Sequence, residues 1–282
     1  MFRVWKLSYE FSSPQRILLH AQIPTITFRG AFGYALAQVI ARYGSIPSLS
    51  DQVSLYRRFF MPQNDGEYES RNQDLARPFV LRGFYSRPDC RSFILELLLF
   101  GKAMEYERFF DQVVEVMSKM GLGPHHTECL FEKLASEEVL VPDPEPGADL
   151  VVEFLTPCVR LKHLGRIYQD EIPFQVLLPR LVDRVVELDR LYGDGTFAGP
   201  EEIHEWKRSA EAVASVKLSG GVYRALRTSG RTGQRMRLDG FVGTMQYTGD
   251  FSGVRQVLRY LPLVNLGRFN VFGCGWCQMW YQ

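Results

Sequence analysis

The chain of 282 residues lacks any long apolar run. A membrane-spanning helix needs about eighteen consecutive apolar residues, and the sequence contains no uninterrupted apolar stretch of that length. The opening MFRVWKLSYEFSS has no apolar block followed by a small-residue cleavage site, so we expect a cytoplasmic protein without a secretion signal. Cysteine is scarce as well. The five cysteines, Cys90, Cys129, Cys158, Cys274 and Cys277, are an odd number, and a disulfide framework is therefore not expected.

Net charge is almost absent, at +1, which neither requires nor excludes a nucleic acid, because phosphate binding depends on where the charge lies. Residues 1–150 contain 16 Lys and Arg against 19 Asp and Glu, a net charge of −3, whereas residues 151–282 contain 17 against 13, a net charge of +4. The first half is thus slightly acidic and the second half basic.

One basic segment, Ala212–Leu238, contains no acidic residue and is rich in glycine. Its six cations are Lys217, Arg224, Arg227, Arg231, Arg235 and Arg237, and its glycines are Gly220, Gly221, Gly230 and Gly233. Unneutralised cations between glycines suit a groove that follows phosphates. We predict such a groove here; the alternative is a solvated basic loop.

Hydrophobic residues make up 46% of the chain and charged residues 23%, and a chain of this length favours two domains. Alternation over Phe2–Phe11 predicts a strand, and Thr27 is expected to cap a helix over Phe28–Ile40 that ends at Gly44. The polar region Ser45–Arg77 is expected to form a loop and a short helix. The following patterns predict strands at Pro78–Phe84 and Ser92–Phe100, a helix at Tyr106–Met120, and closing strands at Leu130–Leu134 and Glu138–Val141.

The passage VPDPEPGAD is the best candidate for a linker, and a second series of elements follows it. The expected elements are strands at Leu150–Leu155, Leu238–Tyr247 and Cys274–Tyr281, and helices at Pro173–Leu191, Pro200–Val213 and Ser252–Leu261. Strand, helix, strands, helix, strand is the order of a ferredoxin-like domain. We therefore predict an α+β protein with two tandem ferredoxin-like (RRM-like) domains, 1–144 and 145–282, and place Leu155 and Tyr281 in one sheet.

Several motifs resemble those of the CRISPR-associated repeat-processing endoribonucleases, a family within the RAMP superfamily of RNA-binding proteins. They are FRGAFGYAL at Phe28–Leu36, RPFVL at Arg77–Leu81, LLLFGKAMEY at Leu97–Tyr106, MGLGPHH at Met120–His126, EFLTPCVRLK at Glu153–Lys162, LDGFVGTMQYTG at Leu238–Gly249 and NLGRFNVFGCGW at Asn265–Trp276. The last motif has the family's glycine spacing at Gly267, Gly273 and Gly275, with Arg268 as the loop's only cation. Glycines there allow close approach to a phosphate, and exposed N–H groups can bind an anion.

The resemblance, which spans nearly the whole chain, implies binding and cleavage of CRISPR repeat RNA. By that resemblance, the RNA's 2′-hydroxyl attacks the neighbouring phosphate, a 2′,3′-cyclic phosphate remains, and no metal or cofactor is needed. Other CRISPR effector subunits are further expected partners, and a membrane is not. The alternative is a non-catalytic subunit that holds the 3′ handle of the guide RNA. An unrelated metabolic enzyme would need a cofactor motif, which the sequence lacks.

The catalytic residues are less certain from the motifs, because the family often has histidine directly after RGAFG and this chain has Tyr34. Tyrosine, with an ordinary pKa near 10, is a poor base at neutral pH but can orient a nucleophile. His20, in the loop before the helix, is the candidate general base, with a solvent-exposed loop histidine as the alternative. Arg29 is the candidate phosphate ligand, with an ordinary surface or salt-bridged arginine as the alternative. We expect Arg29 and Tyr34 to face the same phosphate.

The remaining histidines offer weaker signals. His125, His126 and Cys129 form a lone cluster, and the pair Cys274 and Cys277 does not complete a zinc site with it, so no metal is expected. His125 and His126 are expected in a turn, near RNA or in solvent. His163 lies between Lys162 and Arg166 and is a candidate RNA contact, whereas His204 has glutamates around it and is expected at the surface.

Overall fold

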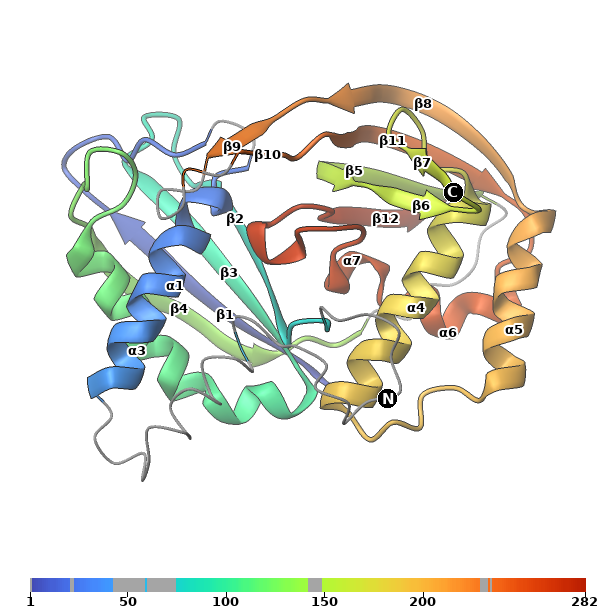
Figure 1. Cartoon of the computed structure of the whole chain (residues 1–282), viewed down its shortest axis with the longest axis horizontal. Helices are drawn as coiled ribbons and strands as arrows, with labels where there is room; N and C mark the ends of the chain where they lie inside the picture. The colour runs from blue at the N-terminus through green and yellow to red at the C-terminus, as the bar shows by residue number, and fades with distance from the viewer. Residues whose placement is uncertain are drawn as a thin grey trace. The chain divides into compact units, whose positions relative to one another are not determined.

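The computed structural model describes residues 2–20, 23–42, 59, 75–141, 149–228, 233 and 235–282. It has two compact units, each with its own sheet and helices (Figure 1). The N-terminal unit consists of Phe2–Val139 and Leu191–Gly193; the C-terminal unit consists of Leu140–Arg190 and Asp194–Gln282. No helix among these described residues is both long and apolar enough to cross a membrane.

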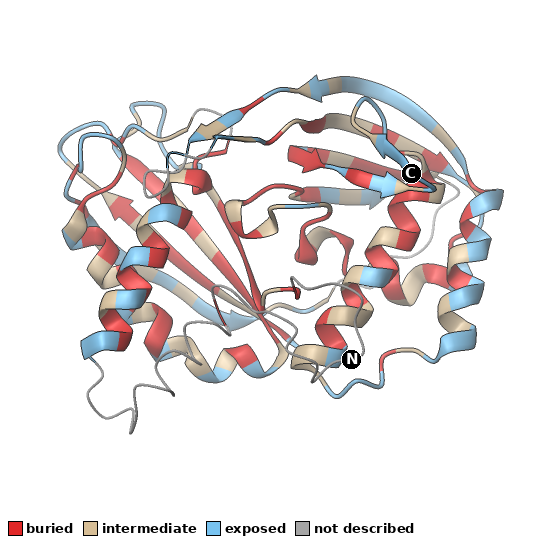
Figure 2. Cartoon of the chain, in the orientation of Figure 1, coloured by how far each residue is buried: buried red, intermediate tan, exposed pale blue. Residues whose placement is uncertain are grey.

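The N-terminal unit is a ferredoxin-like domain. Its elements are β1 (Val4–Ser12), α1 (Thr25–Arg42), β2 (Phe79–Tyr85), β3 (Ser92–Phe100), the 3-10 helix η1 (Gly101–Tyr106), α3 (Glu107–Met120) and β4 (Leu130–Glu138). The four strands form one antiparallel sheet in the order β2-β3-β1-β4. The two helices cover one face, and their buried sides meet the sheet (Figure 2). Phe28 of α1 stacks on Phe93 of β3 with 4.6 Å between ring centroids, and Phe32 of α1 stacks on Phe110 of α3 at 5.9 Å.

Three expectations for this unit need correction or lie outside the described residues. Helix α1 begins at Thr25 rather than after Thr27, because the N–H groups of Ile26 and Thr27 already donate to the carbonyls of Ile23 and Pro24. In place of the two short closing strands expected at Leu130–Leu134 and Glu138–Val141, the structure has one strand, β4, which ends at Glu138 and pairs with β1 around a bulge between Ser8 and Tyr9. Residues 139–141 are not in a strand. Almost all of Ser45–Arg77, and Gly44, lie outside the described residues.

The C-terminal unit repeats the same topology with extra hairpins. Its strands are β5 (Asp149–Val159), β6 (Leu161–His163), β7 (Arg166–Tyr168), β8 (Ala214–Tyr223), β9 (Leu226–Thr228), β10 (Arg235–Arg237), β11 (Gly240–Thr248) and β12 (Cys277–Tyr281). Its helices are α4 (Phe174–Tyr192), α5 (Pro200–Ser209), η2 (Ala210–Ala212), η3 (Ser252–Val254), α6 (Arg255–Leu258), α7 (Leu261–Val264) and η4 (Asn270–Phe272). The main sheet is antiparallel in the order β12-β5-β11-β8. The predicted fold class is confirmed for both units.

The register of this sheet bears out one prediction, and for part of the basic segment it excludes the alternative of a solvated loop. Strand β12 pairs with β5, so that Tyr281 lies opposite Leu150 and the two segments share a sheet as predicted. The first part of the basic segment, however, is not a loop: Ala214–Tyr223 is the edge strand β8, paired with β11. Val216, Leu218 and Val222 alternate with small and polar residues there, a strand pattern that the cations and glycines obscured. The interior of the expected linker, residues 142–148, lies outside the described residues.

Candidate functional site

The glycine-rich loop connects α7 to β12 and packs closely on β5. A Cβ atom added to Gly275, which has φ +78°, would lie 1.7 Å from the carbonyl oxygen of Leu266. One added to Gly267, with φ +89°, would lie 2.7 Å from the carbonyl oxygen of Val159. Side chains cannot be accommodated at these distances, and L residues rarely adopt such φ values. Gly267 therefore allows the loop backbone to touch the strand, and Gly275 allows the loop to pack against its own backbone at Leu266.

The N–H groups of this loop are largely used inside the protein. Gly275 donates to the carbonyl of Pro157 and Gly273 donates to that of Asn270, both at 2.9 Å, while Arg268 donates to Val159 at 2.9 Å. The expectation that exposed glycine N–H groups bind phosphate is therefore wrong for Gly273 and Gly275, because both glycines are buried and already bonded. The exposed side chain of Arg268 is what the loop offers to an anion.

The basic segment and the glycine-rich loop meet at one contact. The guanidinium carbon of Arg227, on β9, lies 4.6 Å from the centroid of the Phe272 ring, on η4. This is cation–π geometry, and burial lowers the pKa of Arg227. The sequence analysis missed Phe272 as a functional candidate, because nothing in the local sequence indicates which residue a distant arginine will cover.

The six cations do not line one groove. In the β9–β10 hairpin Met236 lies opposite Arg227, whereas Arg235 and Arg237 lie one residue to either side of Met236. Because successive side chains alternate between the faces of a strand, Arg227 points to one face and Arg235 and Arg237 to the other. Arg224, just before β9, is exposed. Arg231 lies outside the described residues.

Two of the six cations are also neutralised by acids from beyond the segment. The Lys217 ammonium lies 3.1 Å from Asp170, and the Arg237 guanidinium lies 2.7 Å from Asp239. The description of six unneutralised cations is therefore wrong for these two. Because both ion pairs are partly exposed, phosphate oxygens can replace the two carboxylates at little cost in free energy.

His163 ends β6 in a small hairpin, Leu161–Tyr168, and is half-buried. The turn residues Leu164 and Gly165 both have positive φ, as a two-residue hairpin turn requires. Its neighbour Arg166 lies over the ring of Tyr168 at 4.9 Å. The structure thus places His163 on a hairpin with exposed cations. The contact of His163 with RNA remains a prediction.

His20 lies in the β1–α1 loop of the N-terminal unit and is partly buried. Its Nδ1 accepts a hydrogen bond of 3.3 Å from the backbone N–H of Ile23, and burial lowers its pKa. Two hydrogen bonds to Tyr85 hold this loop: the Leu19 N–H donates to the phenol oxygen at 3.0 Å, and the hydroxyl donates to the carbonyl of Ile17 at 2.6 Å. The ring is thus held in place and neutral at pH 7.

Arg29 and Tyr34 do not face the same side of α1. Five residues at 3.6 residues per turn separate their directions by about 140°. Accordingly Arg29 is buried, with 6% of its surface exposed, and Tyr34 is 62% exposed. The expectation that both contact one phosphate is wrong, since a helix presents residues three or four apart, and not five apart, on one face.

The remaining candidates form no metal site. His125 and His126 lie in an exposed turn, as predicted, and the Cys129 thiol donates to the carbonyl of Thr127 at 3.2 Å. Within the described ranges, no group of three or more His, Cys, Asp or Glu side chains has the arrangement of metal ligands. All five cysteines are free thiols.

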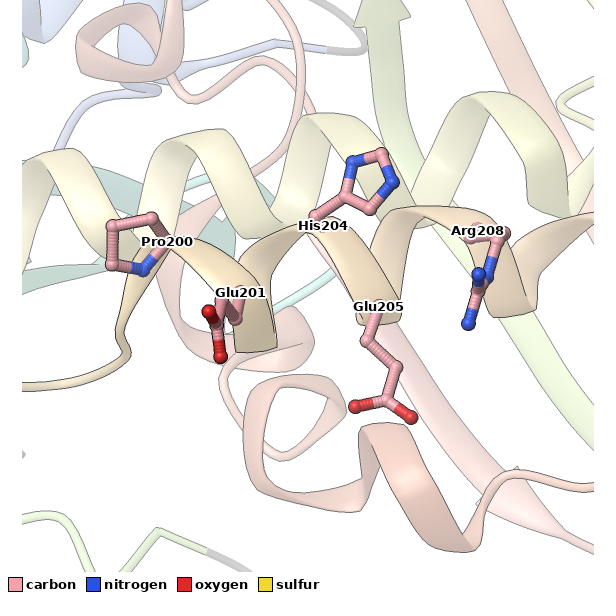
Figure 3. A pocket seen from close by; sticks show the side chains of 5 residues that line it. All are labelled: Pro200, Glu201, His204, Glu205 and Arg208. Atoms are coloured by element: carbon pink, nitrogen blue, oxygen red, sulfur yellow. The ribbon is translucent and has the colours of Figure 1, made fainter.

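A surface depression of about 460 Å³ runs along α5 (Figure 3). Its lining residues are Pro200, Glu201, His204, Glu205 and Arg208. Glu201, His204, Glu205 and Arg208 stand three or four residues apart and share one face of the helix. His204 is exposed, as predicted, and the depression includes none of the candidate site residues.

Sequence comparison gives two matches that together cover most of the chain. A model described as the CRISPR-associated endoribonuclease Cas6 matches residues 152–277. Another, described as an N-terminal domain, matches residues 2–145. Residues 152–277 of the chain are thus similar to the Cas6 family of CRISPR-associated endoribonucleases. This match supports a role in the processing of CRISPR transcripts. No curated protein sequence matches the chain significantly.

Solved Cas6 structures share the fold of this chain. A structure described as a Cas6 product complex is 14% identical, with a TM-score of 0.62, over 99% of both chains. Thermus thermophilus Cas6 is 13% identical, with a TM-score of 0.54, over 99% of this chain and 98% of its own. At such identities the similarity concerns the fold, which is the tandem pair of ferredoxin-like domains.

Proposed function

We propose that this protein binds CRISPR repeat RNA and cuts the precursor transcript into guide RNAs. The RNA's own 2′-hydroxyl attacks the adjacent phosphorus, the bond to the 5′-oxygen of the next nucleotide breaks, and a 2′,3′-cyclic phosphate remains. No metal takes part. The observation that carries the proposal is the match of residues 152–277 to the Cas6 endoribonucleases.

Proton transfer is assigned to His20. Cleavage by a 2′-hydroxyl needs a group that accepts its proton and a group that protonates the departing oxygen. Burial lowers the pKa of His20, which keeps the ring neutral and able to accept a proton at pH 7. Because Nδ1 accepts the N–H of Ile23, the lone pair lies on Nδ1 and the proton on Nε2. This bond is long, at 3.3 Å, so its release on RNA binding costs little and frees Nδ1 for the 2′-hydroxyl.

Phosphate binding is assigned to the guanidinium groups of the C-terminal unit. Arg227 and Arg268 lie on or against the glycine-rich loop, and the exposed Arg224 and Arg235 supply further cations at the β9 and β10 hairpin, with Arg235 on the face opposite Arg227. Guanidinium groups bind phosphate oxygens through two parallel hydrogen bonds. The glycines shape this surface by letting the loop lie on β5, and Lys217, Arg237 and His163 supplement it.

One experiment tests both the metal independence and the chemistry. The purified protein is incubated in EDTA with its repeat RNA and with the same RNA in which the nucleotide before the cut has a 2′-deoxyribose. We expect a single cut of the first RNA, a product end that resists phosphatase until acid opens the cyclic phosphate, and no cut of the second. Cleavage of the deoxy substrate, or cleavage only when a divalent metal is added, contradicts the mechanism.

A second candidate function is a non-catalytic subunit that holds the guide RNA's 3′ handle among other CRISPR effector subunits. One observation favours it: Tyr34 occupies the α1 position where the resemblance expects histidine, and it is 62% exposed. Tight binding of the repeat RNA by the wild-type protein with no product in EDTA or in magnesium would favour this second function over the first.

A further inference from the structure

Three loops of the N-terminal unit leave its sheet at the same end. In the registers of β1, Ser12 lies opposite Ser92, the first residue of β3, and opposite Leu130, the first residue of β4. The β1–α1 loop, the β2–β3 loop and the α3–β4 turn therefore emerge together (Figure 1). All three are largely exposed (Figure 2).

Backbone contacts fasten these loops to one another. The N–H of Ser13 donates to the carbonyl of Arg91 at 3.0 Å, and the N–H of Ile17 donates to that of Cys90 at 2.8 Å. On the other side, a Cβ on Gly123 would lie 2.2 Å from the carbonyl oxygen of Leu18, so the α3–β4 turn touches the β1–α1 loop where only glycine fits. The three loops thus form one surface, which we term the loop end.

The loop end concentrates positive and titratable groups in a unit whose sequence is acidic overall. Arg16, Arg87 and Arg91 are exposed, and within the described ranges their side chains have no hydrogen-bonded or ion-paired partner. His20, His125 and His126 lie on two of the same loops. The acidic residues of these loops are Asp89, which accepts the backbone N–H of Arg91 at 3.0 Å, and the exposed Glu128.

The loop end also exposes apolar surface beside the arginines. The Phe84 side chain, at the end of β2, is 43% exposed, and Leu18 is 41% exposed. Surfaces that bind single-stranded nucleic acid combine two features. Cations bind the phosphates, and an aromatic ring provides a face on which a base can stack. An acidic protein partner would use the arginines but has no need of the exposed ring.

We infer that the loop end is a second RNA-binding surface, at which Arg16, Arg87 and Arg91 bind phosphates of single-stranded RNA and Phe84 stacks on a base. This inference rests on the proposed function and adds a partner surface in the N-terminal unit. Charge counts alone place RNA binding in the C-terminal half, because acidic residues outnumber basic ones in the first half. Acidic groups at the loop end are Asp89, Glu128 and Glu10, whose carboxylate accepts a hydrogen bond from Ser86 at 3.3 Å.

The test is the salt dependence of repeat-RNA binding. Arg87→Ala/Arg91→Ala should raise Kd and flatten the plot of log K against log salt by about 1.4, since each lost single-strand phosphate contact removes roughly 0.7. The matched control is Lys102→Ala/Arg108→Ala, which removes two exposed cations from η1 and α3. It should leave the slope unchanged. Phe84→Ala should raise Kd about tenfold without changing the slope.

Thermal melts establish that each variant is folded. Should Arg87→Ala/Arg91→Ala fail to fold, crosslinking of 4-thiouridine-labelled repeat RNA to wild-type protein replaces it, with crosslinks expected within residues 84–91. Equal slopes for the two double variants, or crosslinks confined to the C-terminal unit, overturn the inference while wild-type cleavage in EDTA still supports the proposed function. Wild-type protein that binds an acidic peptide at the loop end but no repeat RNA overturns both.

Discussion

The guanidinium of Arg227 lies over the ring of Phe272, 4.6 Å from its centroid. This contact brings the hairpin of β9 and β10 against η4 of the glycine-rich loop. The sequence marks the two segments separately, one by charge and the other by glycine spacing. Their contact makes them parts of one surface of the C-terminal unit.

The Arg227 and Phe272 side chains are expected to be energetically coupled in RNA binding. Repeat-RNA affinities of the wild type, Arg227→Ala, Phe272→Ala and the double variant form a cycle. We expect a coupling of about 0.5–1 kcal/mol, because the ring holds the guanidinium in place. Losses that simply add in the double variant would mean that the ring does not position Arg227 for RNA.

Reversal of one exposed charge on the hairpin should flatten the salt dependence of binding. Arg235→Glu is expected to lower the slope of log K against log salt by roughly 0.7–0.9, the effect of one lost phosphate contact. Arg208→Glu, on the exposed face of α5, makes the same charge change and should leave the slope as it is. Equal effects of the two variants would assign the change to net charge alone.

Two variants of His20 separate proton transfer from loop structure. His20→Ala removes both the ring and the acceptor for the Ile23 N–H, whereas the Asn side chain of His20→Asn keeps an acceptor near the position of Nδ1. Both should slow single-turnover cleavage by about 10²–10⁴ with repeat affinity nearly intact, and Tyr34→Phe should have a smaller effect. Near-normal cleavage by His20→Asn would restrict His20 to a positioning role.

The N-terminal unit should lose a defined part of its stability in acid. The Lys133 ammonium lies 2.7 Å from Glu107 and 2.8 Å from Asp111, and Tyr9 donates to Asp111 at 2.7 Å. Burial raises the pKa of Glu107, but hydrogen bonds from Lys133 and Ser136 outweigh it, and the net pKa is lowered. A lowered carboxyl pKa stabilises the fold above the unfolded-state pKa of about 4.3, and this contribution disappears as pH falls through the folded-state value.

Urea unfolding of the wild type and Glu107→Gln between pH 3 and pH 7 measures that contribution. The difference in unfolding free energy should be greatest near pH 7, at about 1–2 kcal/mol, and should shrink below pH 4.3. A difference that does not change with pH would show that the ionised carboxylate is not the stabilising form.

The glycine-rich loop should tolerate no side chain at Gly275. Gly275→Ala places a methyl group 1.7 Å from the Leu266 carbonyl at a positive φ, and it should destabilise the protein by about 3 kcal/mol or more. Gly253→Ala, in η3, meets no atom within 4 Å and should change the stability little. Thermal unfolding of the two variants provides the comparison, and equal melting temperatures would mean that the loop readjusts.

The sequence determined the order of elements, because strand alternation and helical periodicity are local. The strand Ser92–Phe100 has the predicted bounds, and the glycine spacing of Gly267, Gly273 and Gly275 marked a real loop. Strand β8 was not predicted, because its glycines and cations obscure the alternation of apolar and polar residues. The strand is stabilised by its pairing with β11.

Only the tertiary structure decided which polar groups remain available for a ligand. Asp170 neutralises Lys217, Ile23 engages His20, and Pro157 accepts the N–H of Gly275. Packing also buries Arg29 while Tyr34, on the same helix, faces solvent. A sequence specifies which groups can donate or accept, but their partners are set by contacts between distant segments, and those exist only once both sheets have folded.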